Sequence, residues 1–486
     1  MNLSYLLRQA LPHVVALVLY VVVSLLFFGP VSFDNKVLYQ HDILQSAGAN
    51  QEIIEFRERT GEEPLWTNSM FGGMPAYLLT VEYAGDWITT LLQINYLGLP
   101  HPPKLVFVAM LSFYILLLCA GARPWLAIGG GLAYGLSTFL LISIEAGHNA
   151  KVLAMANMPM VLGGVLLMYR NRPIWGFVLT ALGLALHLRA GHLQVTYYLF
   201  LTLVLLGLVW LVLAVRAGQL PLFLKHTGLL VVAALLAVGC NWGRIYNTYK
   251  YSQYSIRGAA ELSAAEDAGA EQAGLDRDYA FAWSSGKAES FTLLIPYFYG
   301  GASGEAVAPD SELARSLRSQ GVPEAQVNQF IQQVPTYFGD QAFTAGPIYV
   351  GAVICFLFVL GLLLAPMEYR IWLVAATVLS LLFSWGKNLD WFNYFMFDYL
   401  PGYNKFRAVT MALSIALMTM PLLGFIGLEY LLRKLYPPVA EGPICHQCGR
   451  RTACQCPQPA QRHPDCCRGY GRYCAAGCAL CRYGQL

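Results

Sequence analysis

Ten runs of mostly apolar residues constrain this chain more than any other feature of its sequence. A helix that crosses the hydrocarbon core of a bilayer, about 30 Å thick, needs about 20 such residues. The runs cover residues 11–29, 105–121, 124–144, 152–169, 174–188, 193–215, 222–242, 346–365, 371–385 and 408–432. Only 12% of the 486 residues are charged and 57% are hydrophobic, whereas a soluble domain carries about 25% charged residues. We therefore exclude a water-soluble enzyme and predict an all-α polytopic membrane protein with about ten transmembrane helices.

The loops between these runs differ in charge on the two sides of the membrane. Residues 30–104 hold nine carboxylates against four basic residues, and residues 243–345 hold twelve against seven. The short loops on the opposite side carry mainly basic residues, namely Arg123, Arg170, Arg172, Arg216, Lys225 and Arg370. Since Lys and Arg in short loops mark the cytoplasmic face, we predict cytoplasmic termini and two large extracytoplasmic loops, 30–104 and 243–345. The first run lacks a small-residue cleavage site, which favours a retained anchor over a cleaved signal.

Four clusters of ionisable residues lie beside the predicted spans, at the ends that face the extracytoplasmic side. They are Tyr39–Asp42, Glu145–Lys151, His187–His192 and Asn404–Arg407. Taken singly, each also fits an ordinary role: a solvated loop carboxylate, an internally paired interfacial loop, side chains that reach the headgroups, or anchors for lipid phosphate. Because ionisable groups beside a membrane usually mark a function, their convergence on one face favours a site.

The residue types in these clusters suit the transfer of a group from a phosphate. A carboxylate serves as general base or metal ligand, while cations stabilise a phosphorylated leaving group such as polyprenyl phosphate. The catalytic candidates are Asp42, Glu145 and His148, and the substrate-binding candidates are Lys151, Arg189, His192, Lys405 and Arg407. A divalent metal, Mg or Mn, is compatible with this set, although no ligand spacing indicates one. The net charge of +3 provides no basic face for a nucleic acid.

Both large loops contain segments with a recognisable pattern. Residues 49–59 place Ile53, Ile54 and Phe56 among charged neighbours, which predicts a short amphipathic helix on the membrane surface. Residues 308–334 have a helical pattern with Ser311 as the cap, and we predict that they form a lid over the site. Residues 259–275 are rich in Ala, Glu and Gly, which predicts a mobile segment.

Several longer motifs resemble the YfhO family of multi-pass bacterial membrane proteins, in the version typical of Bacteroidetes-type bacteria. They are Thr60-Gly-Glu-Glu-Pro-Leu-Trp-Thr-Asn-Ser-Met-Phe-Gly-Gly-Met-Pro-Ala, Glu145-Ala-Gly-His-Asn, Gly191-His-Leu-Gln-Val-Thr-Tyr-Tyr, Gly286-Lys-Ala-Glu-Ser-Phe-Thr-Leu-Leu-Ile-Pro and Pro401-Gly-Tyr-Asn-Lys-Phe-Arg. The resemblance runs from about residue 5 to residue 436. It implies a fold similar to that of GT-C glycosyltransferases, which take a sugar from a polyprenyl-phosphate carrier and act on the extracytoplasmic side of the membrane.

The resemblance also implies roles for particular residues. Asp42 matches the acidic residue of the first outer loop that serves such enzymes as catalytic base or metal ligand, and Glu145 is the candidate for a second acidic position. The expected activity is transfer of a sugar from a polyprenyl-phosphate-linked donor in the lipid bilayer to an extracytoplasmic acceptor, at the bacterial inner membrane. Because family members continue past residue 436, the resemblance further implies a chain truncated at its C-terminus, so an inactive fragment is one alternative.

A transporter or lipid-handling protein is the alternative from another functional class, since it would use the same polar groups. Transporters typically show broken helices in repeat-related pairs and binding groups near the bilayer midplane. We find no clear internal repeat, and the charged clusters lie at the ends of the spans. These two observations favour the enzyme.

The last 50 residues differ in composition from everything before them. Nine of the twelve cysteines lie between Cys445 and Cys481. Three interpretations stay open: out-of-frame or otherwise spurious sequence, which the change of composition favours, a disordered native tail, or a zinc site on the Cys-x-x-Cys pairs 445/448 and 478/481. We therefore divide the chain into a membrane domain, 1–436, and a Cys-rich cytoplasmic tail, 437–486.

Overall fold

A computed structural model of the chain describes residues 3–80, 85–258 and 274–436. The Cys-rich tail, 437–486, and most of the segment predicted to be mobile, 259–275, lie outside the described residues.

Each predicted span coincides with a helix or a pair of helices in the described part of the chain. In chain order they are α1 (Leu3–Phe27), α5 (Pro103–Ala120), α6 (Pro124–Gly135) with α7 (Thr138–Glu145), α8 (Asn149–Tyr169), α9 (Pro173–Arg189), α10 (Leu193–Arg216), α11 (Leu220–Cys240), α16 (Ala352–Leu364), α17 (Met367–Ser384) and α19 (Leu413–Leu435). Among the described residues, one two-stranded antiparallel hairpin, β1 (Trp66–Thr67) with β2 (Met74–Pro75), is the only sheet. The helical secondary structure and the apolar helices confirm the prediction of an all-α polytopic membrane protein.

Three of the ten spans are less regular than their apolar runs suggest. α6 and α7 meet at an angle of 41° across a short break. α9 and α16 are apolar but only 17 and 13 residues long. The described residues therefore contain seven helices that are long and apolar enough to cross a membrane, or eight if the bent pair is one span.

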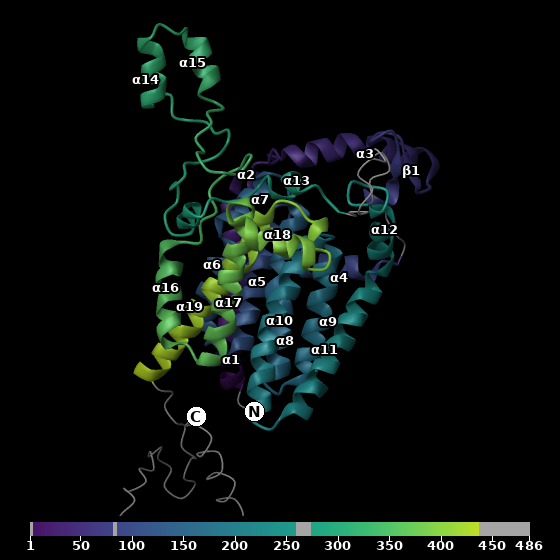
Figure 1. Cartoon of the computed structure of the whole chain (residues 1–486), viewed down its shortest axis with the longest axis vertical. Helices are drawn as coiled ribbons and strands as arrows, with labels where there is room; N and C mark the ends of the chain where they lie inside the picture. Colours follow the sequence, from purple (N-terminus) through teal and green to yellow (C-terminus); the bar gives the residue numbers. More distant parts are fainter. Residues whose placement is uncertain (1–2, 81–84, 259–273, 437–486) are drawn as a thin grey trace, which may run out of the picture. The chain divides into compact units, whose positions relative to one another are not determined.

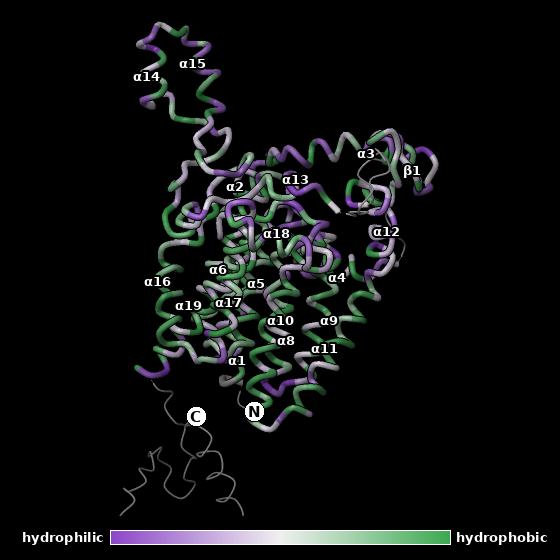
Figure 2. The backbone as a smooth tube through the Cα atoms, viewed as in Figure 1, coloured by the Kyte–Doolittle hydropathy of each residue, from purple (hydrophilic) through white to green (hydrophobic). Residues whose placement is uncertain are grey.

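Three helices form the centre of the bundle. α5, α8 and α19 are mostly buried within the protein, whereas α1, α10 and α11 bury less than a quarter of their apolar stretches, and their other residues are half-buried or exposed. Exposed leucines and valines on these outer helices, such as Leu11, Val18, Leu208 and Leu235, are what a helix that faces lipid presents. The tube coloured by hydropathy in Figure 2 shows green helices along the bundle and purple residues gathered at its ends.

Small residues let α8 and α9 approach each other closely. A Cβ on Gly176 of α9 would lie 2.6 Å from the backbone nitrogen of Met168 and 2.9 Å from the carbonyl oxygen of Gly164, both in α8. A Cβ on Gly164 would in turn meet the backbone nitrogen of Thr180 at 2.6 Å. Close packing between small residues is a main source of helix association inside a bilayer, where the hydrophobic effect between helices is weak.

We expect Gly176→Val to destabilise the folded bundle by about 3 kcal/mol, because the added side chain meets backbone atoms that cannot move aside. The matched control is Gly207→Val in α10, since a Cβ there meets nothing within 4 Å. The measurement is the temperature at which purified protein in detergent loses its monodisperse elution peak. Equal melting temperatures for the two variants would contradict this account of the α8–α9 contact.

The long segments between the spans gather at one end of the bundle, which we call the loop end (Figure 1). They include α2 (Gly29–Phe33), α3 (His41–Thr60), α4 (Trp87–Asn95), α12 (Trp242–Ser252), α13 (Arg277–Phe281) and α18 (Asp390–Tyr399). A helix over 49–59 is confirmed as the second half of α3. Its Ile53 is buried against Ala76, Tyr77 and Leu79 of the same loop rather than exposed.

The segment 308–334 forms two helices rather than one. α14 (Glu312–Ser319) begins at Ser311, whose hydroxyl accepts a hydrogen bond from the backbone of Ala314, as the predicted cap requires. Gly321 adopts the left-handed backbone conformation that turns the chain into α15 (Glu324–Phe330). The two helices pack on each other through Ala314, Val327 and Ile331 and project away from the bundle (Figure 1).

Candidate active site

A cavity of about 370 Å³ at the loop end, which we call the main cavity, contains two of the three predicted catalytic residues, Asp42 and His148. Its apolar wall includes Phe139, Ile142, Trp283, Phe343, Ile348 and Met411, and its polar lining includes His41, Asp42, His148, Lys151, Gln341 and Arg407. An apolar wall with a few convergent polar groups is the usual composition of a small-molecule site. No residue of α14 or α15 lines the main cavity, so the predicted lid is not part of its wall.

A chain of three side chains crosses the polar side of the main cavity. Nε2 of His148 lies 3.1 Å from Oδ2 of Asp42, and Nζ of Lys151 lies 3.1 Å from Nδ1 of His148. Asp42 sits in the first turn of α3, where the positive end of the helix dipole stabilises a carboxylate. Lys151 is 7% exposed, and its Nζ lies 5.0 Å from the ring centroid of Phe139. A carboxylate, an imidazole and a buried ammonium group thus share one site.

The pKa of His148 and its hydrogen bonds to Asp42 and Lys151 assign its protonation state and its tautomer. Burial lowers the pKa of the imidazole, the charge of Lys151 lowers it further, and Asp42 opposes both effects, so the net pKa is below its ordinary value. The ring is therefore neutral at neutral pH. Since the ammonium group can only donate, Nδ1 accepts from Lys151 and Nε2–H donates to Asp42.

Two amide side chains hold the start of α3 against the start of α8. Nε2 of Gln40 donates to the carbonyl of Ile144 and, at 3.2 Å, to Oδ1 of Asn149. Nδ2 of Asn149 donates back to Oε1 of Gln40 at 3.3 Å. Gln40 is 4% exposed, so this pairing is shielded from water. The pairing holds Asp42 close to His148, because Gln40 lies two residues before Asp42 and Asn149 directly follows His148.

Gly147 allows the closest approach between these two segments. Its φ of +89° lies in the left-handed region, which side chains with a Cβ rarely adopt. A Cβ there would lie 3.1 Å from the Cβ of Asp42 and 3.3 Å from the backbone nitrogen of Ile43. The glycine of the Glu-Ala-Gly-His-Asn motif is thus required for contact between Asp42 and His148. Sequence reasoning identified this motif but missed the roles of Gly147, Gln40 and Asn149.

Arg407 supplies a second cation to the main cavity from a distant part of the chain. Its guanidinium group lies 5.2 Å from the ring centroid of Tyr279 and 5.5 Å from that of Trp283, and it donates to the Tyr279 hydroxyl. Stacking of this kind stabilises arginine beside aromatic faces. Arg407 also contributes to the low pKa of His148, so the two groups interact electrostatically.

Lys405, two residues earlier, lies outside the lining of the main cavity. Its Nζ donates to the carbonyl of Arg257 at 2.7 Å, while Nε of Arg257 donates to the carbonyl of Lys405 at 3.0 Å. Burial lowers the pKa of Lys405. This reciprocal pair connects the segment before α19 to the segment that follows α12 and supports the loop that carries Arg407.

The remaining predicted residues, His192, Glu145 and Arg189, are not part of the lining of the main cavity. His192 caps α10, since Nδ1 accepts from the backbone of Val195 at 3.4 Å. Burial, then the charge of Lys151, lower the pKa of His192 to about 4. Glu145, at the C-terminal end of α7, is exposed, and none of the hydrogen bonds among the described residues involves its carboxylate. Arg189 lines a different cavity, where it pairs with Asp86 at 2.7 Å.

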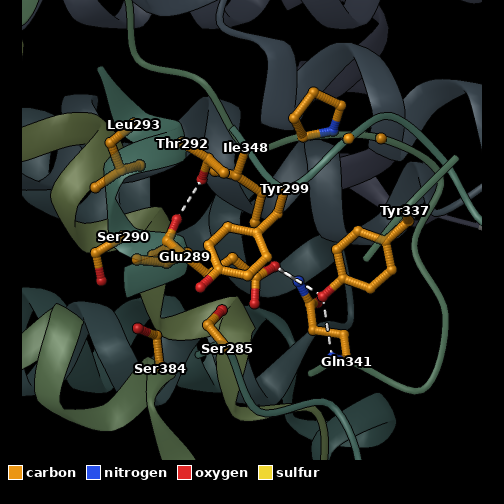
Figure 3. A pocket seen from close by; sticks show the side chains of 14 residues that line it. Ser285, Glu289, Ser290, Thr292, Leu293, Tyr299, Tyr337, Gln341, Ile348 and Ser384 are labelled. Carbon is orange, nitrogen blue, oxygen red and sulfur yellow. Dashed lines mark hydrogen bonds between the residues drawn. The ribbon is translucent and has the colours of Figure 1, made fainter. Parts of the chain in front are cut away.

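A buried carboxylate that sequence reasoning missed lies next to the main cavity. Glu289 is 5% exposed and accepts hydrogen bonds from the backbone of Gly286 at 2.9 Å, the hydroxyl of Tyr337 at 2.8 Å and Nε2 of Gln341 at 2.7 Å. Figure 3 shows Tyr337 and Gln341 pointing toward this carboxylate. Because Gln341 also lines the main cavity, Glu289 fixes part of the cavity wall.

We expect Glu289→Gln to destabilise the segment 337–345 by about 1–3 kcal/mol, because an amide nitrogen then faces buried donors that require an acceptor. Hydrogen exchange of the backbone amides measures this opening, and the amide of Gln341, which donates to the Tyr337 hydroxyl at 3.0 Å, reports it directly. The control is Glu312→Gln, since the side chain of Glu312 is 88% exposed. Unchanged exchange in Glu289→Gln would show that the carboxylate does not hold this wall.

Comparison with known protein families, with curated proteins and with solved structures finds no match for this chain.

Proposed function

We propose that the chain is a membrane-embedded glycosyltransferase that moves a sugar from a polyprenyl-phosphate-linked donor to an extracytoplasmic acceptor. The observation that carries this proposal is the combination of Asp42, His148, Lys151 and Arg407 in one cavity whose remaining wall is apolar. A lipid phosphate needs an apolar surface and cations together, and transfer of its sugar needs a base. The resemblance to the YfhO family and to GT-C enzymes supports the same activity.

The proposal includes a location and an orientation. We place the protein in the bacterial inner membrane with both termini in the cytoplasm, so that the main cavity opens on the extracytoplasmic side. The support is the distribution of charge: carboxylates concentrate in loops 30–104 and 243–345, and basic residues concentrate in the short connections.

In the proposed reaction, a hydroxyl oxygen of the acceptor attacks the anomeric carbon of the sugar. A carbon–oxygen bond forms there, and the bond between the anomeric carbon and the phosphate oxygen breaks. The hydroxyl proton passes to Asp42, whose Oδ2 accepts from His148, so Oδ1 takes the proton. Lys151 and Arg407 stabilise the departing polyprenyl phosphate. We assign Glu145, His192 and Lys405 no direct contact with the reacting atoms. Glu145 stays the candidate for a second acidic group.

The described lining does not fit a divalent metal well. Mg²⁺ and Mn²⁺ prefer several oxygen ligands, whereas the main cavity offers the single carboxylate of Asp42, which faces His148, and two cations. Among the described residues, no group of three His, Cys, Asp or Glu side chains is placed to hold a metal. We therefore derive no step through a metal ion and expect transfer to persist in EDTA. A loss of activity in EDTA that Mg²⁺ or Mn²⁺ restores would contradict this expectation.

The test of the proposed function follows a labelled sugar. Membranes that contain the full chain are supplied with polyprenyl phosphates that carry radiolabelled glucose, galactose, mannose or N-acetylglucosamine, together with an extract of the bacterial envelope as acceptor. We expect one label to move from the lipid fraction to a polar glycoconjugate. If every label stays on the lipid, as in membranes without the chain, the proposal fails.

One observation favours a second candidate, a transporter or lipid-handling protein. The helix pair α6 and α7 is broken by 41°, and Phe139, Ile142 and Ser143 of α7 line the main cavity. Broken helices beside a polar cavity are typical of transporters. The same labelled lipids distinguish the two functions, because a transporter moves the intact lipid between leaflets of a liposome without releasing its sugar.

A further inference from the structure

A second cavity, of about 390 Å³, lies between α4, the end of α9 and the junction of α11 with α12. We call it the side cavity. Its polar lining is Asp86, Arg189, Asn241, Arg244 and Asn247, and Trp87 also lines it. None of these residues lines the main cavity, so the side cavity needs its own explanation.

The side cavity is held in shape by the protein itself. Asp86 caps α4 by accepting from the backbone and hydroxyl of Thr89, at 3.1 and 2.8 Å. Arg189 donates to Asp86 and to the same hydroxyl, with its Nε 2.9 Å away. On the opposite side, Nδ2 of Asn241 donates to the carbonyls of Ala185 and Ala237, at 3.1 and 3.0 Å. Asp86, Arg189 and Asn241 are therefore positioned before any ligand enters.

Three polar residues at the start of α12, Asn241, Arg244 and Asn247, contribute to the lining of the side cavity. Asn241 precedes the first residue of α12, and Arg244 and Asn247 lie three residues apart within the helix, so these two are neighbours on its surface. The side cavity therefore combines acceptors and donors: the carboxylate of Asp86, the guanidinium groups of the two arginines, the amide of Asn247 and the amide oxygen of Asn241, whose nitrogen already donates twice.

This mixture suits hydroxyl groups better than a phosphate. Burial opposes ionisation of Asp86, but the hydrogen bonds from Thr89 and the charges of Arg189 and Arg244 hold the pKa of its carboxyl below the ordinary value. The carboxylate is therefore ionised at neutral pH and repels an anion that contacts it, and it also neutralises Arg189, so that of the two arginines Arg244 alone adds net positive charge. A sugar hydroxyl both donates and accepts, so adjacent hydroxyls pair with a carboxylate and an amide at the same time.

Trp87 completes the set of groups. Its side chain is 78% exposed although it belongs to the lining. An exposed indole at the mouth of a polar cavity offers a flat apolar face beside hydrogen-bonding groups, and the ring of a sugar presents a matching face of C–H groups.

We propose that the side cavity is a carbohydrate-binding site that takes a short oligosaccharide, with one ring on Trp87 and its hydroxyls on Asp86, Asn247 and Arg244. This proposal rests on the side cavity alone and holds whether or not the main cavity transfers a sugar.

The test applies the labelled full chain in detergent to an array of bacterial oligosaccharides and titrates in solution any that bind. We expect at least one to bind, and we expect Trp87→Ala to weaken its binding by about tenfold or more. Asn247→Ala, at the opposite wall, is the second variant. The control is Trp391→Ala, which removes an indole that is 71% exposed and outside the side cavity.

Two results would overturn the proposal. One is an array with no binding above the detergent blank, and the other is binding that both Trp87→Ala and Asn247→Ala leave unchanged. A phospholipid headgroup is the rival occupant, so native mass spectrometry of the same protein measures retained phosphatidylglycerol. Lipid that Arg244→Gln displaces, together with an empty array, would assign the side cavity to the membrane. Binding without sugar transfer would leave this site standing and remove only the proposed enzyme activity.

Discussion

Replacing Asp42 with asparagine is expected to reduce sugar transfer by about 10²–10⁴-fold, the contribution of a general base. The reason is chemical rather than structural. The asparagine side chain has the same shape, and its carbonyl oxygen still accepts from Nε2 of His148, but an amide cannot take the proton of the attacking hydroxyl. We therefore expect normal amounts of protein in the membrane and unchanged binding of the polyprenyl-phosphate donor. The measurement is the initial rate of label transfer at saturating donor.

The control for this variant is Asp34→Asn. Asp34 lies in the same loop and is a carboxylate, but its nearest described cation is Lys36 at 4.0 Å, and it does not line the main cavity. We expect its transfer rate to stay near that of the unmodified chain. An Asp42→Asn protein that folds, binds donor and transfers at the normal rate would remove the catalytic assignment. Glu145→Gln, measured in parallel, tests the second acidic position.

The helices could be predicted from the sequence because a bilayer leaves few options. Inside lipid every backbone polar group must find a partner within the chain, so a long apolar run becomes a helix. The ten runs and the helices therefore coincide. The break between α6 and α7 was not predicted, because Leu136 and Ser137 do not differ from neighbours that continue a helix. The bend depends on tertiary packing, which hydropathy does not report.

The candidate site was predicted in part. The alternation of spans places the four ionisable clusters at one end of the bundle, and Asp42, His148, Lys151 and Arg407 do line one cavity. Arg189 was grouped with them, yet it faces the side cavity because Asp86, about a hundred residues earlier in the chain, forms an ion pair with it. Sequence gives the end of the bundle at which a residue lies but not the direction in which its side chain points.

The groups that position the site were the hardest to predict. Gln40 and Asn149 are neutral amides more than a hundred residues apart, and their reciprocal hydrogen bonds exist only in the folded chain. Glu289 looked like one more carboxylate of an acidic loop, but it is buried and accepts three hydrogen bonds. Residues whose role is to hold another residue have no composition or spacing that distinguishes them beforehand.

Replacing Lys151 with methionine is expected to move the acid limb of the pH–rate profile to higher pH. In the unmodified chain, Lys151 donates to Nδ1 of His148, and its positive charge is among the causes that lower the imidazole pKa. Methionine has a similar length and no charge, so Nδ1 becomes free to bind a proton and the pKa of His148 rises toward its ordinary value. As the pH falls, the variant then protonates His148 earlier. The resulting imidazolium pairs with the carboxylate of Asp42 and makes it a weaker base.

The same substitution should weaken donor binding by about tenfold or more, because a charged hydrogen bond to phosphate is lost. Lys151→Arg separates this charge effect from a packing effect. Arginine keeps the positive charge, so we expect its acid limb to stay close to that of the unmodified chain even if the larger side chain slows transfer. The decisive comparison is the position of the limb rather than the height of the profile. If Lys151→Met and Lys151→Arg lose activity at the same pH, the charge of Lys151 does not control His148, and the proposed coupling from Lys151 through His148 to Asp42 is wrong.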